Sequence, residues 1–114
     1  MEEKKHFIYV ILTQNNKLYC GYTNDVEARY KKHLEGKGAK FTRANKPKAL
    51  VFQKEFQTKH DALCEEIRFK KLTRKQKEDY INWNAVWQLN SGLLFIWLNI
   101  PFIISFISLY LKFL

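Results

Sequence analysis

The chain has 114 residues, with 20 Lys and Arg against 11 Asp and Glu, and a formal net charge of +9. This length predicts one domain with a modest core, and the charge predicts a polyanionic partner, either nucleic acid or an anionic membrane surface, unless it serves solubility alone. Cys20 and Cys64 have no CxxC spacing and the three histidines are scattered, which excludes a zinc pattern and favours two free thiols.

Three strands and three helices are expected in the order β-β-α-β-α-α. Strands are predicted where β-branched and aromatic residues cluster, and helices where a capping residue precedes apolar residues at helical spacing. A turn at 14–16 makes the first two strands a hairpin, and 37–48 is expected to be a basic loop. In chain order the predicted elements are Phe7–Thr13, Lys17–Thr23, Val26–Leu34, Ala49–Phe56, Lys59–Lys71 and Arg74–Trp83. They predict a small α/β (α+β) fold, a three-stranded antiparallel sheet flanked by helices.

Five polar residues from these elements are candidates for a catalytic site. Tyr9 and Tyr19 lie on the two hairpin strands, where both are expected to point to one face as near neighbours. Arg29 and His33 are four residues apart and share one face of the first helix, and Glu66 borders the apolar side of the second helix. Phosphodiester cleavage needs a base for the water, a cation for the phosphate and a carboxylate for a divalent metal, and these residue types supply all three.

Each candidate also has a purely structural interpretation. The tyrosines are then packing residues of the sheet, and the helical Arg–His pair is part of a solvated surface. Glu66 then forms an i,i+4 ion pair with Lys70. Taken singly, the five residues leave both interpretations open.

Taken together, the same residues resemble the signature of the GIY-YIG nuclease superfamily, in particular its short stand-alone bacterial members and the N-terminal nuclease domain of the DNA-repair excinuclease. The first half of the signature is similar to Phe7-Ile8-Tyr9, with Phe in place of Gly, and the second half to Tyr19-Cys20-Gly21. Gly36–Arg43 looks like the loop of the stand-alone branch, and Ala62–Glu78 looks like its glutamate helix and the helix after it. The ordered set with these spacings is more specific than either tripeptide.

The resemblance implies a metal-dependent endonuclease that hydrolyses DNA phosphodiester bonds, with a role in DNA repair or recombination and with branched and damaged DNA among its candidate substrates. It implies that Glu66 holds one Mg²⁺ or Mn²⁺ ion and that Tyr9 is the general base, acting directly or with His33 or a water. Tyr19 would position the nucleophile or the phosphate, and Arg29 would stabilise the developing charge. At Gly21 the backbone would approach the substrate closely. It implies no small-molecule cofactor.

Two basic clusters are expected to contact phosphates. They are Lys37, Lys40, Arg43, Lys46 and Lys48 in the loop, and Lys70, Lys71 and Arg74 in the helices. Neither cluster shows a base-reading pattern, so sequence specificity is not predicted. The second cluster has helical spacing, and a solvated face is its alternative interpretation.

One departure from the family pattern supports a different function. Tyr22 stands where many active relatives have a Lys shortly before the helix begins. Without that Lys the site loses a cation that would lower the pKa of a neighbouring tyrosine. The alternative function is therefore a catalytically weakened, non-specific nucleic-acid-binding module.

The composition changes near residue 90, so we expect a nuclease-like domain at 1–90 and a hydrophobic tail at 91–114. The segment 93–114 carries Lys112 as its only charge and is long enough to cross a bilayer as an apolar C-terminal helix. Trp97 and Tyr110 are placed like interfacial anchors, and the basic segment before them favours a cytoplasmic nuclease domain. The alternatives are a tail buried by packing or oligomerisation, and an out-of-frame or otherwise atypical C-terminus.

Overall fold

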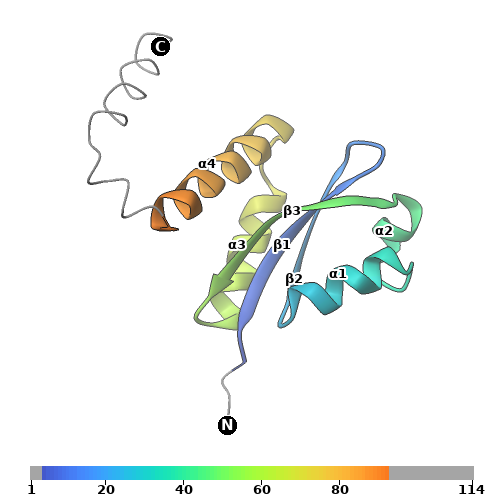
Figure 1. Ribbon diagram of the computed structural model, residues 1–114, viewed down its shortest axis with the longest axis horizontal. Helices are drawn as coiled ribbons and strands as arrows, with labels where there is room; N and C mark the ends of the chain where they lie inside the picture. The colour runs from blue at the N-terminus through green and yellow to red at the C-terminus, as the bar shows by residue number, and fades with distance from the viewer. Residues whose placement is uncertain (1–3, 93–114) are drawn as a thin grey trace. The chain divides into compact units, whose positions relative to one another are not determined.

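A three-stranded antiparallel sheet lies at the centre of this computed structural model, which describes residues 4–92 (Figure 1). The elements are β1 His6–Thr13, β2 Leu18–Thr23, α1 Val26–Leu34, α2 Lys40–Ala44, β3 Pro47–Phe56, α3 Lys59–Lys70 and α4 Arg74–Gly92. The strand order is β2-β1-β3, so β1 is central and β2 forms an edge. The predicted α+β class and the order of the predicted elements are confirmed.

Local sequence signals set most helix boundaries. The Asp25 side chain accepts from a backbone N–H of the first turn of α1, and Thr58 does the same for α3. Thr73 and Gln76 form a reciprocal capping box at the start of α4. Gly36 follows α1 with a φ of 75°, a left-handed conformation that favours glycine after a helix.

The prediction of a continuous loop over 37–48 was wrong. A short helix, α2, occupies Lys40–Ala44, and β3 begins at Pro47 rather than Ala49. The helix has no side-chain cap at Ala39, so its start cannot be predicted from a capping residue in the sequence. Its buried residue, Thr42, bonds instead to a side chain of α1, and this tertiary contact holds the segment in place. At the other end of the domain, α4 continues to Gly92, past the predicted end at Trp83.

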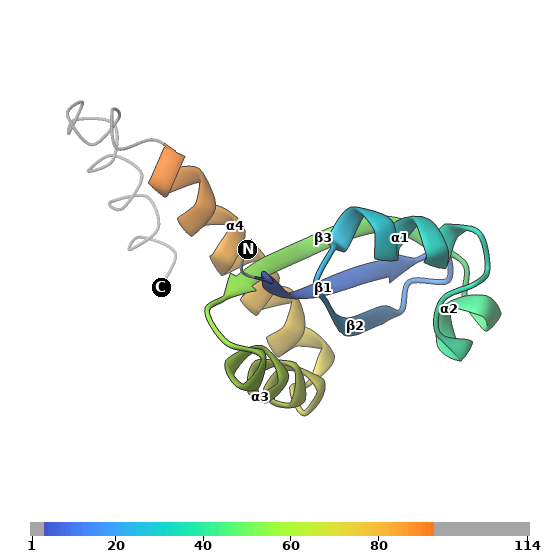
Figure 2. The same ribbon diagram turned by 90° about the horizontal axis from the view of Figure 1, so that it is seen from below.

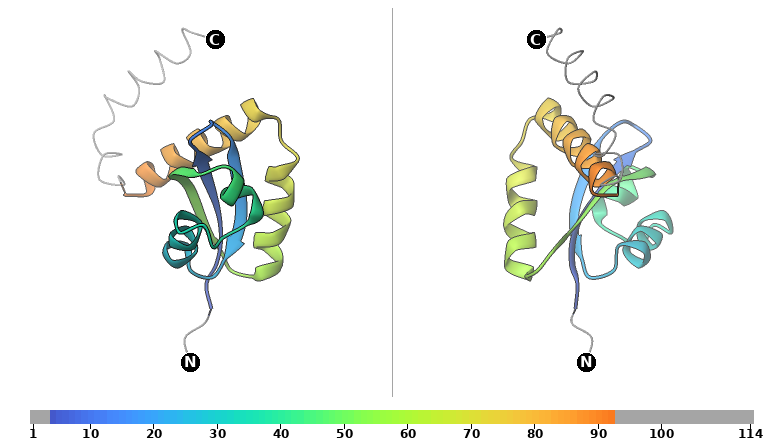
Figure 3. Two further views of the ribbon diagram at one scale, coloured as in Figure 1. Left: turned by 90° about the vertical axis from the view of Figure 1, so that its right-hand side faces the viewer. Right: turned by 60° about the vertical axis from the view of Figure 1, so that its left-hand side comes forward.

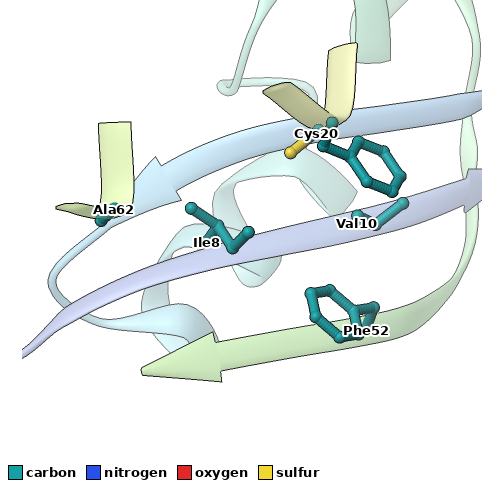
Figure 4. Close-up of a cluster of buried hydrophobic side chains, with 6 residues drawn as sticks. Ile8, Val10, Cys20, Phe52 and Ala62 are labelled. Atoms are coloured by element: carbon teal, nitrogen blue, oxygen red, sulfur yellow. The ribbon is translucent and has the colours of Figure 1, made fainter. Parts of the chain in front are cut away.

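Alternate residues of β1 point to opposite faces of the sheet. Ile8 and Val10 pack with Cys20, Phe52 and Ala62 on the α3 side, as Figure 4 shows. Figures 2 and 3 show α1 and α3 on opposite faces of the sheet. One face is therefore a conventional apolar core, and the other carries different chemistry.

On the opposite side of the sheet, Tyr9 and Ile11 of β1 pack with Val26 of α1. Tyr19, Tyr30 and Leu50 are half-buried around them. Two of the five predicted catalytic residues therefore lie on the face that α1 covers.

By its contacts the chain divides into two units, Met1–Ile81 and Asn82–Leu114. The predicted boundary near residue 90 stays a prediction, and the predicted apolar helix at 93–114 lies outside the described residues. Among residues 4–92, no helix is both long enough and apolar enough to cross a membrane.

Candidate active site

Three buried side chains form a continuous hydrogen-bonded chain beside α1. The Tyr9 hydroxyl lies 2.7 Å from Nε2 of His33, and Nδ1 of His33 lies 2.7 Å from Oγ1 of Thr42. The Thr42 hydroxyl in turn donates to the backbone carbonyl of Ala39 at 2.9 Å. Tyr9, His33 and Thr42 are only 1%, 1% and 2% exposed. Burial strengthens such a chain and holds its members in one orientation.

Tyr19 lies next to this chain, as predicted. The hairpin register pairs Tyr9 with Gly21 and Ile11 with Tyr19, which puts both tyrosines on one face at diagonal positions. Their ring centroids are 6.3 Å apart, and the Tyr19 ring meets His33 edge-on at 5.3 Å. Tyr19 is half-buried, and Phe41 of α2 stacks on it at 5.8 Å. Sequence reasoning missed Phe41.

Arg29 is half-buried on α1 and interacts with both tyrosine hydroxyls. Its interaction with the Tyr9 hydroxyl raises the pKa of the guanidinium. Burial raises the pKa of Tyr9 to about 12, although Arg29 opposes this change. Burial, and after it the Arg29 charge, lowers the pKa of His33. At neutral pH, Tyr9 is therefore a phenol and His33 a neutral imidazole.

Two glycines make this close packing possible. A Cβ atom on Gly21 would lie 2.6 Å from the Tyr9 hydroxyl oxygen and 2.7 Å from Cζ of the same ring. A Cβ atom on Gly38 would overlap the imidazole of His33. The family resemblance implies close approach of the substrate at Gly21, and this role stays a prediction; in the structure the missing Cβ leaves room for Tyr9. Gly38 was missed, and only the clustering of glycines at 36 and 38 could have drawn attention to it.

Glu66 comes from the other side of the sheet, on α3, and does not join this cluster. Its side chain is 14% exposed and its Oε1 lies 2.6 Å from Nζ of Lys70, the i,i+4 pair of the structural interpretation. The bond to Glu66 raises the pKa of Lys70, and Tyr19 adds a smaller electrostatic effect in the same direction. Tyr19 stands on the edge strand β2, so this electrostatic link between the Glu66–Lys70 pair and the site involves a residue of that strand.

Within the described residues, no group of three or more His, Cys, Asp and Glu side chains could hold a metal ion. A single carboxylate fits Mg²⁺, because this ion keeps several waters and binds through one or two carboxylates together with substrate phosphates. The Lys70 ammonium binds Oε1 of Glu66, so a metal ion would bind through the other carboxylate oxygen. The donor set at Glu66 therefore fits one hydrated divalent ion.

The predicted phosphate contacts are all exposed, but they differ in what else they bind. Arg74 donates from Nη1 and Nη2 to the backbone and side-chain oxygens of Asn16, at 2.5 and 3.0 Å, and from Nε to Glu78 at 2.9 Å. It therefore holds the hairpin turn against the start of α4. Lys70 pairs with Glu66. The loop residues Lys37, Lys40, Arg43, Lys46 and Lys48, together with Lys71, present their side chains to solvent.

A pocket of about 550 Å³ adjoins His33 and Thr42. Arg43, Lys46, Gln14 and Glu35 also line it. Two cations against one carboxylate leave the pocket with a net positive charge, which favours a phosphate group. Part of the predicted basic loop thus lies directly beside the buried hydrogen-bonded chain.

Tyr22 points to the α3 side of the sheet. Its hydroxyl lies 2.7 Å from Nδ1 of His6, and its ring packs against the apolar core there. Lys59 places its Nζ 5.7 Å from the centre of the Tyr22 ring. The position at which many relatives have Lys is occupied here by a packing residue.

Known proteins resemble this chain over the region that contains all five predicted catalytic residues. The profile of the GIY-YIG catalytic domain matches residues 5–79. A UPF0213 protein of Bacillus velezensis is 56% identical and the UPF0213 protein YazA of Bacillus subtilis 51% identical, each over 81 residues, or 71% of this chain and 82% of the relative. The solution NMR structure of a protein from E. faecalis is 40% identical, with a TM-score of 0.54 and coverage of 75% of this chain and 91% of that chain.

Proposed function

Because the chain belongs to the GIY-YIG nuclease family, we propose that it is a metal-dependent endonuclease that hydrolyses DNA phosphodiester bonds, with a role in DNA repair or recombination. One observation carries the catalytic part of this proposal. The buried Tyr9 hydroxyl is placed between a cation, Arg29, and a neutral base, His33. This is the arrangement of a tyrosine that takes a proton from water while it gives up its own.

The proton route follows from the acidities. A tyrosine with a pKa of about 12 is almost never a phenolate at pH 7. The Tyr9 oxygen therefore accepts the proton of the attacking water as its own proton passes to Nε2 of His33, 2.7 Å away. The charge that appears on the imidazole is shared with the hydrogen bond to Thr42. Since Tyr9 is 1% exposed, this route requires the water to pass the half-buried side chains of Arg29 and Tyr19.

The remaining residues act on the phosphate. Arg29 donates to the phosphoryl oxygens as negative charge develops on them, and Tyr19 holds the nucleophile or the phosphate at the mouth of the site. Glu66 would hold one Mg²⁺ or Mn²⁺ ion, and such an ion, when bound, supplies Lewis-acid stabilisation of the phosphoryl oxygens. Arg43 and Lys46, beside the pocket, bind flanking phosphates.

A second candidate function is supported by Tyr22. This position holds a tyrosine that packs and bonds to His6 instead of a lysine, as expected of a weakened site that only binds nucleic acid. On this interpretation only the basic surface matters.

A cleavage assay separates the two functions. Duplex, branched and single-stranded DNA are incubated with Mg²⁺ or Mn²⁺, with and without chelator. The wild type should nick at least one substrate only with metal, and Glu66→Ala and Arg29→Ala should abolish nicking while circular dichroism stays unchanged. Glu27→Ala and Lys32→Ala, at exposed positions of α1, are the controls. Equal cleavage by the wild type and both site variants would refute the nuclease, and chelator-independent, salt-dependent binding without cleavage would favour the binding module.

A further inference from the structure

We infer that Thr42 is a positioning residue that fixes the tautomer of His33, so that Nε2 is always the nitrogen that receives the Tyr9 proton. This inference deepens the proposed function and rests on it for its catalytic consequence. The hydrogen bonds of Thr42 with Ala39 and with His33 can each run in only one direction.

The backbone carbonyl of Ala39 sets that direction. A carbonyl oxygen can only accept, so the 2.9 Å bond from Oγ1 of Thr42 uses the single proton of the hydroxyl. The same Oγ1 atom lies 2.7 Å from Nδ1 of His33 and has no second proton to give. It must accept, and Nδ1 must carry the proton.

A neutral imidazole with its proton on Nδ1 has a lone pair on Nε2. The Tyr9 hydroxyl, 2.7 Å from Nε2, therefore donates to it. Arg29, which interacts with the Tyr9 hydroxyl, can only donate, so it cannot take the phenolic proton, which remains for His33. Donation therefore runs in one direction along the chain: Tyr9 donates to His33, His33 donates to Thr42, and Thr42 donates to the Ala39 carbonyl.

The opposite tautomer would prevent the transfer. A proton on Nε2 would point at the Tyr9 oxygen, and Tyr9 would have no base to receive its own proton. Nδ1 would then require the Thr42 proton, which would leave the Ala39 carbonyl without it. After transfer, by contrast, an imidazolium donates from both nitrogens, and Thr42 accepts in the same geometry as before.

The local fold is built around this contact. Thr42 is the buried residue of α2, a helix without a side-chain cap. Gly38, just before it, has no Cβ and so lets the backbone lie against the imidazole. Among the described residues no buried side-chain nitrogen or oxygen lacks a hydrogen-bond partner. The segment from Gly38 to Thr42 therefore serves as a support for one side of His33.

The tautomer is measured directly by ¹⁵N NMR of the imidazoles, because protonated and unprotonated ring nitrogens give well separated signals. The chain has three histidines, and the His33 signals are those lost in His33→Gln. In the wild type at pH 8, Nδ1 should be protonated and Nε2 unprotonated. A wild-type His33 with its proton on Nε2 would overturn the inference without any variant.

Two substitutions test the part played by Thr42. Thr42→Val keeps the shape and removes the hydroxyl, so the Nε2–H tautomer should become populated; Thr42→Ser keeps the hydroxyl and should behave as wild type. In cleavage, Thr42→Val should lower kcat about 10- to 100-fold with KM unchanged, and Thr42→Ser should restore it. An unchanged tautomer in folded Thr42→Val would refute the role, and should that variant not fold, a loss of the Nδ1–H form in Thr42→Ser would do so.

The two proposals fail separately. If the wild type cleaves no DNA, the nuclease proposal fails, while the ¹⁵N spectra still report whether Thr42 fixes the tautomer. If the wild type cleaves DNA and the tautomer is the opposite one, the nuclease proposal stands and the positioning role of Thr42 falls.

Discussion

Replacing Gly21 with alanine is expected to destabilise the protein, although alanine is normally the better residue inside a strand. Gly21 pairs with Tyr9 across the hairpin, and the new Cβ would lie 2.6 Å from the hydroxyl oxygen and 2.7 Å from Cζ. The ring cannot move away freely, because its hydroxyl is bound to His33 and the side chain is 1% exposed. The added methyl group therefore has to displace a buried aromatic ring.

The two opposing effects have different sizes. Alanine in place of a strand glycine normally gains about 0.5–1 kcal/mol, since it restricts the unfolded chain. Overpacking a filled core costs about 1–3 kcal/mol. The net loss should therefore lie between about 0 and 2.5 kcal/mol, and for a domain of this size each kcal/mol lowers the Tm by about 4–8 °C.

Urea unfolding of Gly21→Ala in two backgrounds isolates the contact. In the Tyr9→Leu background the far end of the ring is absent, so Gly21→Ala should become neutral or stabilising there. The double-mutant cycle should thus give a coupling energy of at least about 1 kcal/mol. The same loss in both backgrounds, or a more stable Gly21→Ala single variant, would refute the argument from packing.

Three further outcomes are expected. Tyr9→Phe removes the donor to the buried Nε2 of His33, so it should cost about 1–3 kcal/mol in urea unfolding and abolish cleavage; full activity would contradict the proton route. Burial and the Arg29 charge lower the pKa of His33 from its usual 6.5, so below pH 6.5 the unfolded chain binds more protons at this site than the folded protein. The stability due to neutral His33 is therefore present above pH 6.5 and lost as pH falls through the folded pKa; Tm measured from pH 8 to pH 5 should fall less in His33→Gln, and parallel curves would count against it. Burial raises the pKa of Cys20 to about 12, whereas Cys64 is exposed, so a thiol reagent should titrate Cys64 in the native protein and Cys20 only in urea.

The parts of the fold that the sequence predicted depend on neighbouring residues. The hairpin follows from two β-rich runs around a turn, and the starts of α1 and α3 follow from capping side chains at Asp25 and Thr58. Strand alternation also places Tyr9 and Tyr19 on one face once the turn fixes the register. For these residues, local chemistry and the final fold agree.

The parts that the sequence did not predict depend on contacts between distant segments. α2 has no cap, and its buried residue Thr42 finds its partner in α1. Gly38 and Phe41 likewise derive their roles from His33 and Tyr19, which lie in other elements. Such pairings are invisible in the spacing of a single chain.

The position of Glu66 relative to the tyrosines could not be predicted from helical spacing. Helical spacing indicates which side of α3 is apolar, but not which face of the sheet that side will cover. In the structure α3 packs on the face opposite α1, so Glu66 lies across the sheet from Tyr9 and His33. The proposed metal ligand and the proposed proton acceptor therefore belong to two different layers.

The central strand makes these layers separately adjustable. Ile8 and Val10 pack in the apolar layer beneath α3, and Tyr9 packs in the layer beneath α1. Neighbouring positions on β1 therefore contribute to stability on one face and to the candidate site on the other. A protein engineer seeking a more heat-resistant variant could therefore repack positions 8 and 10 with Phe52 while positions 9 and 33 stay fixed. In such a library thermal tolerance and the proposed catalytic rate should vary independently, except where repacking moves α3, the helix that carries Glu66.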